Sequence, residues 1–217
     1  MRIWIETIAP GTDEGARAVP AMIRRRLSAV GKLALGALAG LDPAQHEPMV
    51  FASSWGDADK GAELLSQAAA EGSVSPMGFS GSVHNAVGAI ASIWLKNKLA
   101  YRSVSAGCET TESGLVEAAM ELQAHDSVLF VRYEGARPAL YSGLALPDLP
   151  HQAYAWACRI VKGPSLGAAL CVELTRIGAA AGAPDFDAAS EIAFLGDPSA
   201  TVLQHGPWLW KKVSPCS

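Results

Sequence analysis

The sequence predicts an α/β domain built in layers, with a mixed sheet of five strands flanked by helices. Apolar runs of strand length alternate with helical segments through the first half of the chain, which favours parallel neighbours in the sheet. Two further apolar runs follow with turn residues between them, which favours antiparallel pairing. With 217 residues, half of them hydrophobic, the chain is long enough for a single domain with a substantial core over 1–217.

The elements of the first half can be placed from periodicity and turn residues. Pro20 suits the first turn of a helix, because its fixed φ is helical and its missing N–H is not needed there. The apolar residues of this helix recur at helical spacing: Ile23, Leu27, Val30, Leu33 and Leu38. The other predicted elements are strands at Arg2–Ile5, Pro48–Ser53 and Tyr101–Ser105, a helix at Lys60–Ala70 with Leu64 and Leu65 facing inward, an alanine-rich helix at Asn85–Leu95 buried on most sides, and a helix at Glu109–Ala124.

The second half begins with a strand at Ser127–Tyr133. The runs Ala153–Val161 and Leu166–Leu174 are separated by Lys162-Gly163-Pro164, so we expect them to form an antiparallel pair. From about residue 183 the chain is rich in Pro, Asp and Gly, and we expect an irregular tail with one short helix near Ala188–Leu195. Two tryptophans near the end, Trp208 and Trp210, are expected to anchor this tail on the body or on a partner.

Composition excludes several classes of function. The net charge of −4 argues against nucleic-acid binding, which usually requires a basic face. No apolar run has the length of a signal peptide or a membrane span, and the widely spaced cysteines form no CxxC pair, so a cytoplasmic protein with reduced thiols is expected. Neither a metal-ligand spacing nor a glycine-rich phosphate loop is present, so no metal or cofactor is predicted. Only 18% of residues are charged, which suggests that a partner covers some apolar surface.

The most specific signal is the stretch Ser75–Leu122, which reads SPMGFSGSVHNAVGAIASIWLKNKLAYRSVSAGCETTESGLVEAAMEL. It resembles the segment of β-ketoacyl synthases, condensing enzymes of the thiolase fold, that leads to the nucleophilic cysteine. The family pattern is a Ser-Pro-x-x-Phe turn, an Asn-headed helix of small residues, a strand, and then Ser-Thr-Ala-Cys-Ala-Thr. The last part here reads Ser105-Ala106-Gly107-Cys108-Glu109-Thr110. The resemblance covers about Met1 to Leu174 and implies a thiolase-like half-fold, the N-terminal half only.

Cys108 aligns with the family's nucleophile, at a strand-to-helix turn where a helix N-terminus stabilises a thiolate. Against catalysis, Glu109 follows directly and Glu112 lies one turn on, and nearby carboxylates raise the pKa of a thiol. The family also uses two histidines in His-Gly-Thr and Asn-x-x-Gly-His type motifs. Neither motif stands before Ser217, and His205-Gly206-Pro207 does not match. We therefore expect no catalytic residue in this chain, with Cys108 as the only candidate and an inherited turn as the favoured interpretation.

The helix after Cys108 has a polar stripe and an opposing apolar face. The stripe consists of Glu109, Ser113, Glu117 and Glu121, and the apolar face consists of Leu115, Ala118, Ala119 and Leu122. The resemblance implies that this helix is sandwiched between two sheets in a full ketosynthase. A polar stripe then indicates that the second sheet is missing and that one face meets water.

Further residues fall into two predicted surfaces. The resemblance places a tunnel and partner interface at Met77, Phe79, His84, Asn85, Tyr101, Ser103, Ser105, Gly107 and Cys108. For Met77 and Phe79 an ordinary core position is the alternative, and Asn85 is also explained as a helix cap. Arg24, Arg25 and Arg26 form a basic cluster that could dock an acidic acyl carrier protein, with a solvated helix face as the alternative.

The function implied by the resemblance is that of a chain-length-factor subunit like those of aryl-polyene gene clusters. Such a subunit pairs with a full ketosynthase, shapes the acyl tunnel and stabilises the dimer, while the partner holds the Cys-His-His chemistry. We expect Lys98–Ser105 to form the dimer edge, because an unpaired edge strand is prone to aggregation. Two alternatives stay open: a stand-alone thiol acyltransferase that uses Cys108, and a carrier-protein binding module that acts alone.

Overall fold

The computed structural model describes residues 1–144, 150–164, 167–178 and 189–214. Its centre is one mixed sheet of eight strands in the order β3-β2-β4-β5-β1-β6-β8-β7. The strands are β1 (Arg2–Pro10), β2 (Met49–Ala52), β3 (Tyr101–Val104), β4 (Ser127–Glu134), β5 (Tyr154–Val161), β6 (Leu170–Arg176), β7 (Val202–His205) and β8 (Trp208–Val213). The α/β class is confirmed, but the predicted number of five strands is wrong.

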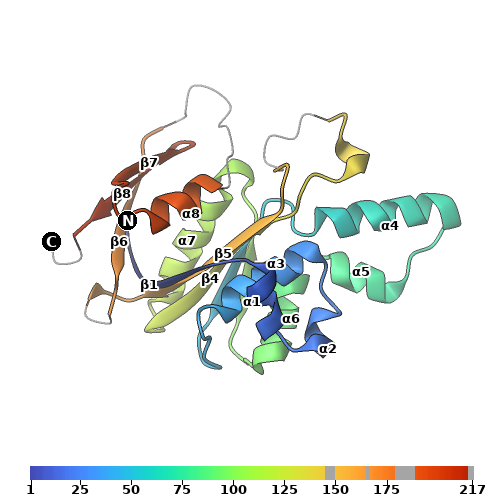
Figure 1. Ribbon diagram of the computed structural model, residues 1–217, viewed down its shortest axis with the longest axis horizontal. Coiled ribbons are helices and arrows are strands. Elements are labelled where there is room, and N and C mark those ends of the chain that lie inside the picture. The colour runs from blue at the N-terminus through green and yellow to red at the C-terminus, as the bar shows by residue number, and fades with distance from the viewer. Residues whose placement is uncertain (145–149, 165–166, 179–188, 215–217) are drawn as a thin grey trace.

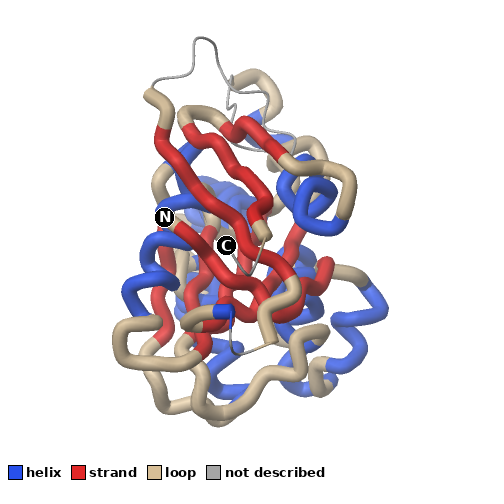
Figure 2. Tube along the Cα trace, turned by 90° about the vertical axis from the view of Figure 1, so that its left-hand side faces the viewer, coloured by secondary structure: helices blue, strands red, loops and turns tan. Residues whose placement is uncertain are grey.

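Helices cover both faces of the sheet (Figures 1 and 2). They are α1 (Asp13–Ala18), α2 (Ala21–Arg24), α3 (Ala29–Ala39), α4 (Ala58–Glu71), α5 (Pro76–Ser82), α6 (Ala86–Leu95), α7 (Thr110–Glu121) and α8 (Ala189–Gly196), with short 3-10 turns η1 (Gly107–Glu109) and η2 (Ala139–Tyr141). One apolar cluster lies between the sheet and α3 and α6. A second lies under α7 and α8 on the other face. The α4–α5 pair extends away from the sheet as an arm (Figure 1).

The parallel part of the sheet follows from the apolar runs that predicted it. β2 pairs in parallel with β3 on one side and β4 on the other, and all four β2 residues are buried. A strand buried on both faces reads as a continuous apolar run, as Met49–Ala52 does.

The expected hairpin of the second half is not formed. β5 and β6 both pair antiparallel with β1, which lies between them. β5 ends opposite Trp4 and β6 begins opposite Ile5, both within β1. Residues 165–166 of the connection, including the predicted strand start Leu166, lie outside the described residues. β1, from the start of the chain, lies between β5 and β6. The local turn signal between these two runs could not reveal this insertion.

The C-terminal segment forms a helix and two strands within its described residues. The short helix predicted near Ala188–Leu195 is present as α8, although Ala188 itself lies outside the described residues. The irregular tail expected beyond it is wrong over 202–213, where β7 and β8 pair and β8 joins β6. These strands extend the sheet by tertiary pairing rather than by a strong apolar pattern of their own.

Three helix predictions need correction. The long helix after Pro20 breaks into α2 and α3, because the Ser28 hydroxyl caps a new helix by accepting a bond from Gly31 N at 3.2 Å. Leu64 is buried as expected, but Leu65 is 58% exposed because the arm has only one covered side. α6 buries Val87, Ile90 and Ala91 yet leaves Ile93 53% exposed.

Candidate functional site

The Ser105–Thr110 turn is built by hydrogen bonds within its own six residues. The Thr110 hydroxyl donates to Gly107 O at 2.7 Å and accepts from Ala106 N at 2.9 Å. Gly107 has a φ of +55°, a left-handed conformation that glycine adopts without a steric penalty. Cys108 is partly buried in η1, between β3 and α7. The predicted strand-to-helix turn around Cys108 is therefore present, with a 3-10 turn before the regular helix.

The loop after β2 holds this turn in place. The Ser54 hydroxyl donates to Gly107 O at 2.9 Å, and the Ser105 hydroxyl donates to Ser54 O at 2.9 Å. Glu134, fully buried, accepts in turn from this loop: Oε2 from Ser54 N at 2.7 Å and Oε1 from Trp55 N at 3.0 Å. A buried carboxylate at the end of β4 thus fixes the position of the Cys108 turn.

His84 and Asn85 both stand near the start of α6 but have different roles. His84 Nε2 lies 2.7 Å from Ser53 O, so the ring nitrogen donates to the loop that carries Ser54. Asn85 occupies the N-cap position, as predicted, but its side chain makes no capping hydrogen bond and is exposed. His84 therefore supports the loop, and the capping explanation for the Asn85 side chain is wrong.

The carboxylates after Cys108 are engaged by the C-terminal strands. Glu109 accepts two bonds from Arg176, at 3.1 and 3.2 Å, and one from Trp208 Nε1 at 2.8 Å. These hydrogen bonds, first from Arg176 and then from Trp208, lower the pKa of Glu109. Glu112 is fully buried and accepts from Trp210 Nε1 at 2.8 Å. The expected anchoring by both tryptophans is confirmed, and a cationic or N–H partner opposes each of these carboxylates.

His205 lies between two carboxylates, those of Glu112 and Glu191. Its Nδ1 lies 2.6 Å from Glu112 Oε1, and its Nε2 lies 3.4 Å from Glu191 Oε1. Burial by itself would lower the pKa of His205, but the hydrogen bond to Glu112 and the charge of Glu191 outweigh it and raise the pKa. The two ring nitrogens of His205 thus each face a carboxylate, one from α7 and one from α8.

This His205 contact belongs to a larger buried polar network that the sequence reasoning missed. Glu191 accepts from Thr111 at 2.6 Å and from Trp156 Nε1 at 2.9 Å. Arg132 donates to Thr111 at 2.9 Å and to Glu134 at 2.9 Å. The signal was present in the sequence, because Arg132 and Glu134 are charged residues within an apolar run, and buried charges must be paired.

The predicted partner interface lies at one end of the sheet. β3 is the terminal strand there, and among the described strands it pairs with β2 alone. The Tyr101 ring packs on α6 at Gly88, where an added Cβ would come within 2.6 Å of the ring. Arg102 binds Glu117 and Glu121 at 3.0 and 2.9 Å, and the buried Ser103 hydroxyl has no hydrogen-bond partner among the described residues.

Met77 and Phe79 are not core residues. They are 85% and 59% exposed on α5, which contacts α6, and α6 in turn contacts β3. We call the surface formed by β3, Met77, Phe79 and Ile93 the partner face.

The α7 stripe also differs from its predicted role. Leu115, Ala118 and Leu122 are buried as expected. The stripe residues Glu109, Glu117 and Glu121 are partly buried in ion pairs, while Val116 and Met120 are 40% and 64% exposed. The side of α7 that meets water is therefore apolar rather than polar.

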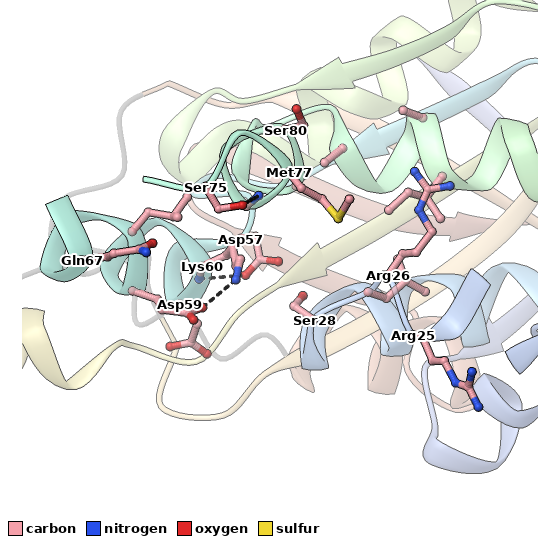
Figure 3. A pocket seen from close by; sticks show the side chains of 18 of the residues that line it. Arg25, Arg26, Ser28, Asp57, Asp59, Lys60, Gln67, Ser75, Met77 and Ser80 are labelled. Atoms are coloured by element: carbon pink, nitrogen blue, oxygen red, sulfur yellow. Dashed lines mark hydrogen bonds and ion pairs between the residues drawn. The ribbon is translucent and has the colours of Figure 1, made fainter. Parts of the chain in front are cut away.

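The three arginines separate into two groups. Arg24 Nη1 donates to Val19 O at 3.1 Å and to Arg17 O at 3.2 Å, so it binds carbonyls after α1 and does not belong to an unoccupied basic patch. Arg25 and Arg26 are exposed and line an open pocket of about 840 Å³ together with Ser75 and Met77. Figure 3 shows Met77 and Arg26 directed toward the same space, whereas Arg25 points away from it.

Two further searches cover the described part of the chain. Within it, no three His, Cys, Asp or Glu side chains are grouped so that they could hold a metal ion. Every helix found there is too short or too polar to cross a membrane.

Two features point to the class of protein. One is the mixed sheet covered by helices on both faces, and the other is the strand-turn-helix unit that carries Cys108. The chain belongs to the β-ketoacyl synthase family: it matches the family's N-terminal domain over residues 4–210. A comparison with curated protein sequences gave no match.

Solved structures place the chain more narrowly within that class. It is similar to a chain of the complex between the ketosynthase ApeO and its chain length factor ApeC from Xenorhabdus doucetiae, with 25% identity and a TM-score of 0.78. That alignment spans 99% of this chain and 100% of the other. The ishigamide ketosynthase/chain length factor (12% identity, TM-score 0.61) aligns over 82% of this chain and 68% of its own. The ketosynthase complex AntDE:AntF, a type II system with its acyl carrier protein (12%, 0.62), aligns over 80% and 68%. At this identity the last two show the fold alone.

Proposed function

We propose that this chain is a non-catalytic, chain-length-factor-like subunit that pairs with a full ketosynthase through the partner face. The pair elongates acyl chains held on a carrier protein, and this subunit shapes the tunnel and stabilises its partner. The single observation that carries the proposal is the position of β3, a terminal strand in contact with α6, where α6 and its neighbour α5 carry large exposed apolar side chains.

The backbone of β3 supports pairing with another chain. A terminal strand presents N–H and C=O groups on its outer side, and protein sheets usually protect such edges by charge, bulges or cover. On β3 only Arg102 is charged, and ion pairs with Glu117 and Glu121 hold its side chain against α7. A strand from a second chain would satisfy the outer backbone groups and continue the sheet.

The exposed side chains beside β3 support the same conclusion. Met77, Phe79 and Ile93 are each more than half exposed although they are large and apolar. A cluster of this kind on one side of a domain marks an interaction surface more often than a scatter of single residues does. Burying these side chains against a partner would add apolar contact to the backbone pairing.

The comparisons support the choice of partner. The similar chain of the Xenorhabdus doucetiae structure aligns over its whole length and comes from a complex of a ketosynthase with its chain length factor. In this proposal the partner supplies the cysteine and histidines of condensation. Cys108 then marks shared ancestry and a position at the partner face.

A carrier protein would dock near the exposed arginine Arg25. Its guanidinium has no hydrogen bond or ion pair among the described residues and points away from the pocket. Arginine binds carboxylates through paired N–H groups, which suits an acidic carrier surface. Arg24 does not belong to this docking site, because its guanidinium already donates hydrogen bonds to backbone carbonyls.

The test is co-purification of the chain with a tagged ketosynthase partner. Phe79→Asp places a charge on the partner face and should weaken the complex more than about tenfold, because a buried unpaired charge costs several kcal/mol. Ile177→Asp is the control, since Ile177 is 52% exposed directly after β6, and four strands lie between β6 and β3 in the sheet. Equal co-purification of both variants would contradict the proposal, as would a wild-type chain that stays a stable monomer beside the ketosynthase.

A further inference from the structure

β7 has few side chains that hold it against the helices. This strand (Val202–His205) is terminal in the sheet and pairs with β8 over four positions. Val202 is 52% exposed and Gln204 is exposed, so both face solvent rather than the helices. Leu203 is partly buried against the apolar cluster under α7 and α8. His205, at the end of the strand, is the residue that contacts carboxylates of both helices.

The His205 ring needs its proton to fit between these two carboxylates. Nδ1 lies 2.6 Å from Glu112 Oε1 of α7, and Nε2 lies 3.4 Å from Glu191 Oε1 of α8. A charged imidazolium donates from both nitrogens, whereas a neutral ring has one N–H and one lone pair. In either neutral tautomer, a lone pair therefore faces a carboxylate. Only 11% of the side chain is exposed, so water has little room to supply the missing donor.

Glu112 has few donors besides His205. Its Oε1 accepts from Trp210 Nε1 at 2.8 Å, while its Oε2 is buried and has no hydrogen-bond partner among the described residues. Glu191 accepts from two other side chains, but it is also buried. Without the charge on His205, two buried carboxylates lie beside a neutral ring, and burial makes such an arrangement unfavourable.

Charged groups from three elements act on the His205 ring: Glu112 of α7, Glu191 of α8 and Arg132 of β4. Burial lowers the pKa of His205, and the charge of Arg132 does the same. The hydrogen bond to Glu112 and the charges of the two carboxylates outweigh these effects and raise the pKa. From β8, Trp210 packs edge-on against the imidazole, at 6.2 Å between ring centroids. The surroundings of the ring therefore favour its protonated form.

We infer that His205 makes β7 a pH-sensitive latch: the strand is docked on α7 and α8 while the ring carries its proton, and it opens when the proton is lost. Opening lets water reach Glu112 and Glu191, which are buried in the docked state. The docked state is stable below the ordinary histidine pKa of about 6.5 and is lost as the pH rises through the raised pKa of docked His205. β8 stays in the sheet, because it pairs with β6 over six positions. The latch lies within one chain and does not depend on the proposed function.

Amide hydrogen exchange at pH 6 and pH 9 tests the latch in the full chain. Protection factors, which correct for the faster intrinsic exchange at high pH, are compared for residues 202–205 in β7 and 127–134 in β4. We expect protection at 202–205 to fall about tenfold, since one unit of pKa difference between docked and open His205 shifts the equilibrium by that factor. Protection at 127–134 should stay unchanged.

His205→Gln removes the charge at every pH. Protection at 202–205 should then be low already at pH 6 and should not change with pH. His125→Gln is the matched control, because His125 is a second partly buried histidine, 4.0 Å from a carboxylate oxygen of Glu121. This control variant should keep the wild-type response.

Three results would overturn the inference. One is equal protection of 202–205 at both pH values in the wild-type chain, and another is a pH response that persists in His205→Gln. The third is an equal fall at 127–134, which would show that the whole chain responds rather than β7. The first and third results come from the wild-type chain alone, so the test holds even if His205→Gln does not fold.

Discussion

The two ends of the sheet differ in how completely the rest of the chain covers them and supplies partners for their polar groups. At the β6–β8 end, a buried network pairs the carboxylates of Glu112 and Glu191 with His205 and with tryptophan N–H groups, and Trp210 is 1% exposed. At the β3 end, no described strand pairs with the outer side of β3, and Met77 and Phe79 are mostly exposed. At the first end the chain's own C-terminal segment supplies the polar partners, although β7 is itself a terminal strand. In our proposal, another chain covers the second end.

The largest effect is expected from breaking, at Arg132 of β4, the buried network that continues through Thr111 and Glu191 to His205 at the β7–β8 end. This guanidinium is buried and binds Thr111, Glu134 and the carbonyl of Tyr133. Arg132→Ala leaves the Glu134 carboxylate buried without its cation and should reduce the free energy of unfolding by about 3–5 kcal/mol. Urea denaturation followed by circular dichroism measures the change, and a loss below about 1 kcal/mol would show that the network does not stabilise this end.

A second large effect is expected at Trp210. Its ring packs edge-on against Phe194 at 6.3 Å between centroids, and its N–H binds Glu112. Trp210→Phe keeps most of the apolar volume but removes the donor to a buried carboxylate, so a loss of about 1–3 kcal/mol is expected in the same denaturation experiment. Trp55→Phe, on a residue that is 39% exposed, is the control and should change stability little.

The pH dependence of stability tests the charge of His205. Because the folded pKa of His205 is raised, its stabilising contribution is fully present below the ordinary histidine value of about 6.5 and is lost as the pH rises through the folded pKa. Between pH 6 and 9 the wild-type chain should therefore lose stability as the pH rises. His205→Gln should flatten this slope, while His125→Gln, on a half-buried histidine at the end of α7, should keep it. A wild-type slope of opposite sign would contradict the assignment.

These predictions also show what the sequence could reveal and what it could not. Continuous apolar runs identified β2 and β4, and the Ser105–Thr110 motif identified the turn with its left-handed Gly107, because each depends on neighbouring residues. The insertion of β1 between β5 and β6, and the pairing of β8 with β6, depend on contacts between distant segments. A turn signal at Lys162-Gly163-Pro164 therefore predicted the wrong neighbours.

In the candidate site, too, the sequence predicted features that depend on neighbouring residues and missed those that depend on distant contacts. Local patterning correctly predicted the strand that begins at Tyr101 and the turn at Gly107 and Cys108, while the interface position came from the family resemblance. It could not show that Arg24 binds carbonyls, since that depends on how α1 and α2 meet. Nor could it join His205 to Glu112, which lie 93 residues apart in the chain. Charged residues at buried positions are the clue in such cases, because each requires a partner from elsewhere.

The smallest effect is expected at Cys108. If the partner supplies the condensing cysteine, Cys108→Ala should leave the chain-elongation rate and product length of the heterodimer unchanged. The assay is carrier-bound product analysis by mass spectrometry, with the cysteine of the partner ketosynthase replaced as the positive control. A loss of activity with Cys108→Ala comparable to that of the control would favour a thiol enzyme instead.

Amide hydrogen exchange tests the central claim most directly, because it reports on the outer backbone groups of β3. The chain is compared alone and after addition of the ketosynthase, with residues 101–104 and 202–205 read as peptides from the two ends of the sheet. The account predicts that exchange at 101–104 slows on complex formation while 202–205 is unchanged. Unchanged exchange at 101–104 in a complex that has formed would contradict it.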